Sequence, residues 1–336
     1  MIFDPNAAAP PNSGIFGFPY SIEKSKIILI PVPWDATASY GKGASFGPQA
    51  IFEASKYIEF GDIDLGNFFE NGISMEHGST NVKQWNKEAN TLFEQINAQG
   101  GVDPTNKLAK NINVFCEKMN EAVYKNVCKY LANGQVVGII GGEHSVSFGA
   151  IEAHVEKFPS IGVLQIDAHC DLRNAFEGIQ FSHASIMFNV LKKLNVHKIV
   201  QVGIRDFCPE EHDTIINSQG RIHTFFERNI AESKSEGKTW NNICDSIVAA
   251  LPEKIYLSLD IDGLDPSLCP NTGTPVPGGL SYQEIITLLK RIVESGKQIV
   301  GFDLVEVTPG KHTNMDANVG AHLLYQLCGW CLRSNE

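Results

Sequence analysis

The sequence predicts a three-layer α/β/α fold around a mostly parallel sheet, and two patterns support this prediction. The first is a set of short, mainly apolar runs without polar alternation, as in strands that helices cover on both faces. These runs are residues 27–32, 136–140, 161–166, 199–202, 255–259 and 299–304. The second is a set of segments with helical spacing, at residues 48–57, 109–131, 183–194, 240–251 and 282–295. Such alternation of strands and helices is typical of βαβ units and a parallel sheet.

The domain organisation follows from length and composition. A chain of 336 residues allows one large α/β domain or two medium ones. No repeat and no clear boundary divides it, so we expect a single domain over residues 1–336 with an N-terminal extension at 1–25. Residues 66–105 are polar and Asn-rich, with one helix-like piece near 84–99. We expect this segment to be an insertion over one edge of the sheet.

The charge and cysteine content exclude some classes of protein. The formal net charge of −11 argues against a nucleic-acid partner, which needs clustered cations, and is compatible with a small cationic substrate. No apolar run reaches 18 residues, so no membrane partner is expected. The start of the chain lacks the pattern of a signal peptide, and the 8 cysteines are scattered. These features predict a cytoplasmic protein with free thiols.

Metal-ligand residue types follow three of the predicted strands. His144 comes soon after residues 136–140, and Asp260 and Asp262 come directly after residues 255–259. The run after residues 161–166 supplies three more, at Asp167, His169 and Asp171. Ligands bind beyond the carboxyl ends of parallel strands, and alternate residues of extended backbone point to one side. We therefore expect an extended backbone through residues 167–171 and 260–262. We also expect the six side chains to converge on one point.

The charge of this group indicates two divalent ions rather than one. A lone Asp-x-Asp is more often a loop or capping feature. Here Asp-x-His-x-Asp follows one predicted strand directly, and Gly-Gly-Glu-His and Asp-x-Asp follow two others, and the three together are specific. Four carboxylates held close together would raise one another's pKa, and two divalent cations balance their charge. A carboxylate-rich set with one imidazole per ion favours Mn²⁺ over Zn²⁺. Two ions of this kind lower the pKa of a shared water toward about 7.

These motifs resemble those of the ureohydrolases, the family of arginase, agmatinase and their relatives. The resemblance runs from residue 27 to nearly the C-terminus. It is carried by residues 31–35, 45–48, 141–144, 167–171, 182–183, 203–205, 258–266, 272–275, 278–280 and 303–309. It implies an eight-stranded, mostly parallel sheet, a centre of two Mn²⁺ ions with Ni²⁺ in one branch, and a homotrimer or homohexamer. It also implies hydrolysis of a guanidino group to urea and an amine.

The resemblance assigns roles residue by residue. The six residues named above match the family's metal ligands. Glu306 matches the glutamate that pairs with the substrate guanidinium, as a carboxylate does with a planar fork. His183 matches the histidine beside the reacting centre, where an imidazole suits proton delivery to the leaving amine. Asp167, Glu143 and Asp262 are alternative acid–base partners.

The expected substrate wall resembles agmatinases and plant arginases more than animal-type arginases. Its residues are Arg173, Phe176, Glu177 and Asp206. Cys208 stands where animal-type arginases carry an amino-binding Asp, whereas Glu211 matches one of their acidic positions. Phe176, Glu177 and the net charge favour agmatine, but Arg173 would suit the carboxylate of arginine or a guanidino acid. Agmatine is preferred, then arginine, then guanidinobutyrate, other guanidino acids or guanidine. Arg205 is expected to be structural or at a subunit contact.

Two other classes of protein remain as alternatives. A single-zinc deacetylase-like enzyme would keep an Asp-x-His and one further Asp, without needing both His144 and Asp171. A metal-free scaffold derived from the enzyme should have lost a ligand or Glu306, and the chain keeps them all. The complete set therefore favours the binuclear hydrolase.

Overall fold

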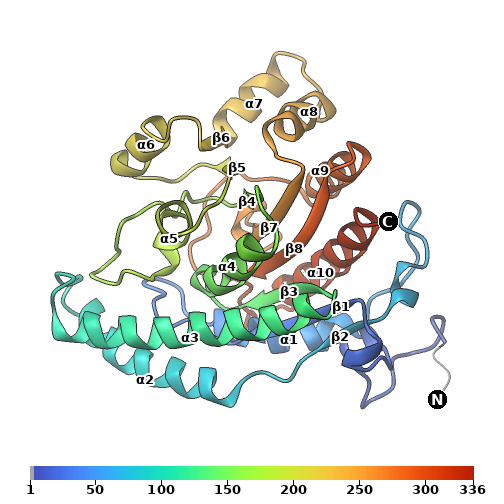
Figure 1. Cartoon of the computed structure of the whole chain (residues 1–336), viewed down its shortest axis with the longest axis horizontal. Helices are drawn as coiled ribbons and strands as arrows, with labels where there is room; N and C mark the ends of the chain where they lie inside the picture. The colour runs from blue at the N-terminus through green and yellow to red at the C-terminus, as the bar shows by residue number, and fades with distance from the viewer. Residues whose placement is uncertain (1–3) are drawn as a thin grey trace.

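The computed structural model describes residues 4–336, and within them one sheet of eight parallel strands runs through the molecule (Figure 1). The order across the sheet is β2-β1-β3-β8-β7-β4-β5-β6. The strands are β1 (Ile27–Val32), β2 (Ile73–Met75), β3 (Val136–Gly141), β4 (Gly162–Ile166), β5 (Lys198–Ile204), β6 (Ile222–Phe226), β7 (Lys254–Asp260) and β8 (Gln298–Val305). Every pairing is parallel, so the predicted fold class is confirmed.

Helices cover both faces of this sheet. Those of one face are α1 (Gly47–Ser55), α7 (Glu227–Ser235), α8 (Trp240–Ala250), α9 (Tyr282–Glu294) and α10 (Met315–Arg333). Those of the other face are α3 (Lys107–Ala132), α4 (Phe148–Lys157) and α5 (Ile186–Lys193), with α2 (Thr80–Asn97) packed against α3. The helix α6 (Pro209–Ile216) lies beside β6. Among the helices of residues 4–336, none combines the length and apolar character that crossing a membrane requires.

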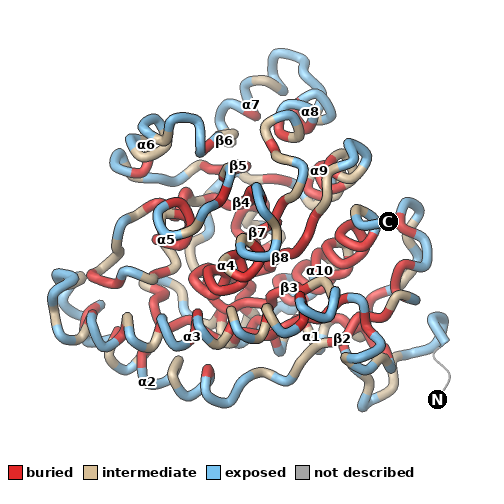
Figure 2. The backbone as a smooth tube through the Cα atoms, viewed as in Figure 1, coloured by how far each residue is buried: buried red, intermediate tan, exposed pale blue. Residues whose placement is uncertain are grey.

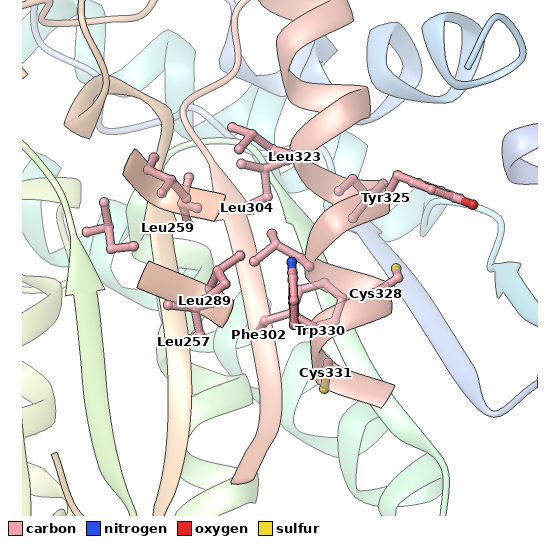
Figure 3. Packing of buried hydrophobic residues seen from close by; sticks show 14 of the residues in the cluster. Leu257, Leu259, Leu289, Phe302, Leu304, Leu323, Tyr325, Cys328, Trp330 and Cys331 are labelled. Carbon is pink, nitrogen blue, oxygen red and sulfur yellow. The ribbon is translucent and has the colours of Figure 1, made fainter. Parts of the chain in front are cut away.

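The continuous apolar runs are explained by burial on both sides. Ile27 and Leu29 of β1 pack into the cluster that includes α10, whereas Ile28 and Ile30 pack into the cluster that includes α3. Figure 2 shows the sheet and most of α10 buried and the outer faces of the peripheral helices exposed. Figure 3 shows the layer between the strands β7 and β8 and the helix α10, formed by Leu257, Leu259, Phe302, Leu304, Leu323, Cys328 and Trp330.

The six predicted strands are present, and the two edge strands were missed. β2 has only three residues and lies in the polar segment 66–105, so its pattern is too short to detect. β6 has one buried residue and four that are exposed or half-buried, so it lacks the run of a central strand. The segment 66–105 contains β2 and α2, so it supplies an edge of the sheet.

The strand order brings together segments that are distant in the sequence. β8 and β7 lie between β3 and β4, so the carboxyl ends of these four strands are neighbours. From β4 the chain continues to β5 on one side, whereas from the neighbouring strand β7 it continues to β8 on the other side. Open α/β sheets bind their ligands where the chain changes direction in this way.

Candidate metal centre

The six predicted ligands meet at the carboxyl ends of the four central strands. His144 follows β3, Asp260 ends β7, and Asp262 lies in the short 3₁₀ helix Ile261–Gly263. The other three, Asp167, His169 and Asp171, follow β4. Because all strands are parallel, their last residues reach the same edge of the sheet.

The first group surrounds one ring nitrogen of His144. Its Nδ1 lies 2.9 Å from an oxygen of Asp171, 3.1 Å from Oδ2 of Asp167 and 3.4 Å from Oδ2 of Asp260. The imidazole and all three carboxylates are buried. One imidazole and three carboxylates around a single point match the ligands that Mn²⁺ prefers.

The second group surrounds His169. Its Nδ1 lies 3.0 Å from Oδ2 of Asp262 and 3.6 Å from Oδ1 of Asp167. Asp167 therefore directs one oxygen toward each histidine. Its carboxylate belongs to both candidate metal sites, which are His144, Asp167 and Asp171, and Asp167, His169 and Asp262. A shared carboxylate is the arrangement expected between two adjacent cations.

The titration of this cluster depends on its internal charge balance. Burial, reinforced by the charge of Asp167, raises the pKa of Asp171 to about 7. Burial and the neighbouring Asp262 likewise raise the pKa of Asp260 well above its usual range. Burial alone would lower the pKa of His169, but Asp262 and Asp167 outweigh it and raise the pKa to about 12. The protein chain alone thus retains protons at sites where cations would replace them.

The donor set fits two divalent ions. Among the described residues, Nδ1 of His144 is buried and accepts or donates no hydrogen bond of good geometry, although three carboxylates surround it. A buried nitrogen with no such bond carries a desolvation cost that a coordinated cation removes. The residues around His144 and His169 therefore fit a pair of divalent cations.

Buried polar contacts behind the ligands hold them in place. Nε2 of His144 lies 2.8 Å from the hydroxyl of Ser258, which donates to Asp303 at 2.9 Å. Gln165 donates to Asp167 at 2.7 Å, and Gln201 donates to Gln165 at 2.7 Å. Contacts of this kind orient metal ligands. Sequence reasoning missed them, although a glutamine within each apolar run, 161–166 and 199–202, was a visible signal.

The predicted extended backbone through the ligand motifs is wrong. Asp171 has a φ of 54°, so the chain turns there through the left-handed region. Asp260 begins a 3₁₀ turn, in which its side chain accepts a hydrogen bond from the backbone N–H of Asp262 at 2.9 Å. Glu306 also has a positive φ, of 61°. Non-glycine residues in this region cost of order 1–3 kcal/mol each and concentrate at functional sites.

A cavity of about 270 Å³ opens over the metal ligands. Of the expected wall, Arg173, Phe176 and Asp206 line it, and so do His183 and Glu306. The guanidinium of Arg173 lies 4.9 Å from the centre of the Phe176 ring, and that ring meets His183 edge-on at 5.8 Å. The side chain of Asp206 is 69% exposed, so its carboxylate lies at the mouth of the cavity.

Glu177, the fourth residue of the expected wall, is not among the residues that line this cavity. Its φ of 50° places it in a left-handed turn, and its side chain lies over Gly101, in the loop between α2 and α3. The turn between Phe176 and Ile179 accounts for the change of direction.

Two further residues act as connections between loops. Arg205 donates to five carbonyl oxygens, of Gly203, Asp262, Gly263, Leu264 and Val276, which matches its expected structural role. The carboxylate of Glu211 accepts the N–H groups of Leu172 and Cys208, at 3.0 Å and 2.9 Å. It thereby joins the ligand loop after β4 to the cavity wall.

Comparisons with known proteins identify the family. The family model described as "Arginase family" matches residues 25–329. An "N(1)-aminopropylagmatine ureohydrolase" of Thermus thermophilus is 32% identical over 309 residues, 91% of this chain and 90% of that one. Another protein of that description, from Synechocystis sp., is 30% identical over 312 residues, 92% and 90% of the two chains.

A solved structure supports the same fold. The proclavaminate amidino hydrolase of Streptomyces clavuligerus superposes with a TM-score of 0.77 at 23% identity, over 98% of this chain and all of that one. Together with the match over residues 25–329, these likenesses show that the chain belongs to the arginase family, the ureohydrolases.

Proposed function

We propose that this enzyme hydrolyses the guanidino group of agmatine, or of an agmatine with a longer amine tail, to urea and the corresponding amine. In this reaction water adds its oxygen to the guanidinium carbon, the bond from that carbon to the alkyl nitrogen breaks, and a proton passes to the leaving amine. The observation that carries the proposal is Glu306, a buried carboxylate at the cavity whose neighbours in space are the metal ligands.

The metal requirement follows from the donor set. His144, Asp171 and Asp260 would hold one divalent ion, and His169 and Asp262 would hold the other, with Asp167 between them. Two bound ions supply a water of low pKa as nucleophile. We propose Mn²⁺ as the natural metal because the set is rich in carboxylates, with Ni²⁺ as the alternative.

Glu306 would bind the substrate's positive charge. One oxygen of its carboxylate accepts a hydrogen bond from the backbone N–H of His144 at 2.8 Å. This bond fixes the side chain of Glu306 beside the metal centre. Burial, together with the charge of Glu143, raises the pKa of Glu306 well above its usual range. A guanidinium in the cavity would supply the missing positive charge and form charge-assisted hydrogen bonds.

His183 would move the proton. Burial and the neighbouring His169 lower the pKa of His183 to about 4, so its imidazole is neutral at pH 7. A neutral imidazole can take up a proton from water and release it to the leaving amine. Its Nδ1 is buried without a hydrogen-bond partner among the described residues, so no protein group there fixes the state of the ring.

The cavity wall favours agmatine over arginine. Arginine brings an α-amino group and an α-carboxylate, and the position expected for amino recognition is occupied by Cys208. The carboxylate of Glu211 is already engaged by two backbone N–H groups. The carboxylate of Asp206 lies at the mouth, where it can meet the distal ammonium of a decarboxylated substrate. Arg173, which could meet a carboxylate, is the feature that favours arginine.

A longer amine tail is the second candidate for a specific reason. The relatives from Synechocystis sp. and Thermus thermophilus are named for N(1)-aminopropylagmatine, and Asp206 lies at the open side of the cavity. Both substrates present the same guanidinobutyl group to the metal centre. They differ only beyond the nitrogen that would face Asp206.

A direct comparison of substrates tests the proposal. Urea release should be measured on agmatine, N(1)-aminopropylagmatine, arginine, guanidinobutyrate and guanidine, with Mn²⁺ and separately with Ni²⁺. We expect the highest kcat/KM for one of the two agmatines with Mn²⁺. Urea from arginine alone would overturn the substrate assignment, and urea from none of the five would overturn the reaction.

Assembly and location complete the proposal. We propose a homotrimer or homohexamer, as the family resemblance implies, and a cytoplasmic location. Light scattering on the purified enzyme checks the first, since a monomer at micromolar concentration would contradict it.

A further inference from the structure

Glu143 has a different environment from the ligand that follows it. It lies between Gly142 and His144, but its side chain turns from the metal ligands toward the loop after β1. One carboxylate oxygen accepts the indole N–H of Trp34 at 3.0 Å and the hydroxyl of Ser145 at 2.7 Å. The side chains of Glu143 and Trp34 are fully buried. A buried carboxylate surrounded by donors is a structural anchor rather than a free base.

Thr37 connects this anchor to His183. Its backbone N–H and its hydroxyl both donate to Glu143, at 2.9 Å and 2.6 Å. The same hydroxyl oxygen accepts the backbone N–H of His183 at 3.1 Å. Thr37 is completely buried, so water does not compete for either bond. The hydroxyl is thus oriented by Glu143 and presents its lone pair to His183.

We infer that Glu143 and Thr37 are positioning residues that hold His183 in its working place beside the metal centre. The loop that they fix also carries Ser39, which lines the cavity. The ring of His183 has an edge-on contact with Phe176 and no side-chain hydrogen bond among the described residues. Its backbone anchor therefore decides where the imidazole lies. A displacement of about 1 Å at such a group can cost on the order of 100-fold in rate.

This inference rests on the proposed function, in which His183 moves a proton. It differs from an acid–base role for Glu143, because a positioning residue changes the rate without adding a titration of its own. It also predicts that Thr37 and Glu143 affect the rate through the position of His183. Removing the hydroxyl of Thr37 should then matter only while the imidazole is present.

The test compares Thr37→Val with Thr37→Ser, with Thr287→Val on α9 as a control. We expect Thr37→Val to retain two Mn²⁺ per chain, to lower kcat about 30-fold and to change KM less than about threefold. Thr37→Ser should recover kcat to within about threefold, and Thr287→Val should match the wild type. In a His183→Ala background, Thr37→Val should cost less than about threefold. An equal loss in both backgrounds would overturn the inference.

A second measurement does not depend on activity. Hydrogen exchange followed by mass spectrometry over residues 180–187 should show faster exchange in Thr37→Val and recovery in Thr37→Ser, because His183 loses and regains its acceptor. Unchanged exchange in Thr37→Val would overturn the inference. Glu143→Gln should lower kcat but keep the pH midpoints of the wild-type rate profile, and a lost limb would overturn the positioning role. A wild type that releases no urea would instead overturn the proposed function.

Discussion

The metal edge of the sheet and the wall of the cavity differ in how they are built. The edge consists of residues at the carboxyl ends of four adjacent strands, and all of its metal ligands except the partly exposed His169 are buried. The buried polar groups Ser258 and Gln165 hold His144 and Asp167 in place. The wall consists of half-buried or exposed residues on loops, such as Arg173 and Asp206. Deep, rigid groups suit the reaction that all substrates share, whereas loop residues suit the choice of substrate. Substitutions in the two regions should therefore change different kinetic constants.

The largest effect is expected at Asp167. Asp167→Asn removes the whole negative charge of the carboxylate that both candidate metal sites share, so metal content and turnover should fall together. We expect kcat to fall by at least about 10³-fold, as for a loss of several kcal/mol of transition-state stabilisation. Elemental analysis and urea release should be measured on the same sample. Asp213→Asn, at an exposed position of α6, is the matched control. Full activity in Asp167→Asn would remove that residue from the centre.

The next effect is expected at His183, which lies between the two regions. His183→Ala should keep two metal ions per chain and lower kcat on the order of 100-fold, because general acid–base catalysis contributes about 10²–10⁴-fold. The KM should change little. Unchanged turnover in a variant that retains its metal would exclude the proton-transfer role.

A smaller and different effect is expected at the wall. Asp206→Asn should raise the KM for agmatine about fivefold and leave kcat and metal content nearly unchanged, because an exposed charge contributes about 1 kcal/mol or less. The KM for uncharged-tail analogues such as butylguanidine should not move. An equal increase for both substrates would show that Asp206 does not contact the distal ammonium.

The smallest effect concerns stability and pH. Without metal, the pKa of His169 is raised to about 12 from 6.5, so its stabilising charge is complete below pH 6.5 and is lost as the pH rises toward 12. The pKa of Asp171 is raised to about 7, so this group adds a loss of folding stability as the pH rises from its unfolded pKa of 3.8 to about 7. The melting temperature of chelated protein should therefore fall on the order of 5 °C from pH 6.5 to 9.

The metal-loaded protein provides the comparison for this measurement. Cations replace the retained protons, so its melting temperature should be nearly constant over the same range. If chelated and loaded samples gave parallel curves, the cluster would not be the origin of the pH dependence.

The metal edge was predictable from sequence because parallel strands end together. Asp167, His169 and Asp260 could be placed from the apolar runs before them, without knowledge of the strand order. The turn at Asp171 was not predictable, because a left-handed residue other than glycine has no clear signature in one sequence. The edge strand β2 was missed because three residues show no period.

The supporting contacts were less predictable, since they depend on which strands are neighbours. Ser258 meets His144 only because β7 and β3 reach the same site with β8 between them. Thr37 and His183 are 146 positions apart, and no local pattern connects them. The turn at Glu177, which directs its side chain toward Gly101, was not predictable because the motif around it gives its order along the chain but not the direction of its turn. Loop conformation thus limits prediction of the wall more than of the metal edge.

We propose above all that the edge of the sheet holds two divalent ions that share Asp167. The most direct test is the metal content of the purified enzyme after saturation with Mn²⁺ and removal of unbound ions, measured with the protein concentration by elemental analysis. We expect two ions per chain in a preparation that releases urea from agmatine or its aminopropyl derivative. A folded preparation, active at full rate with one ion or none, would contradict it.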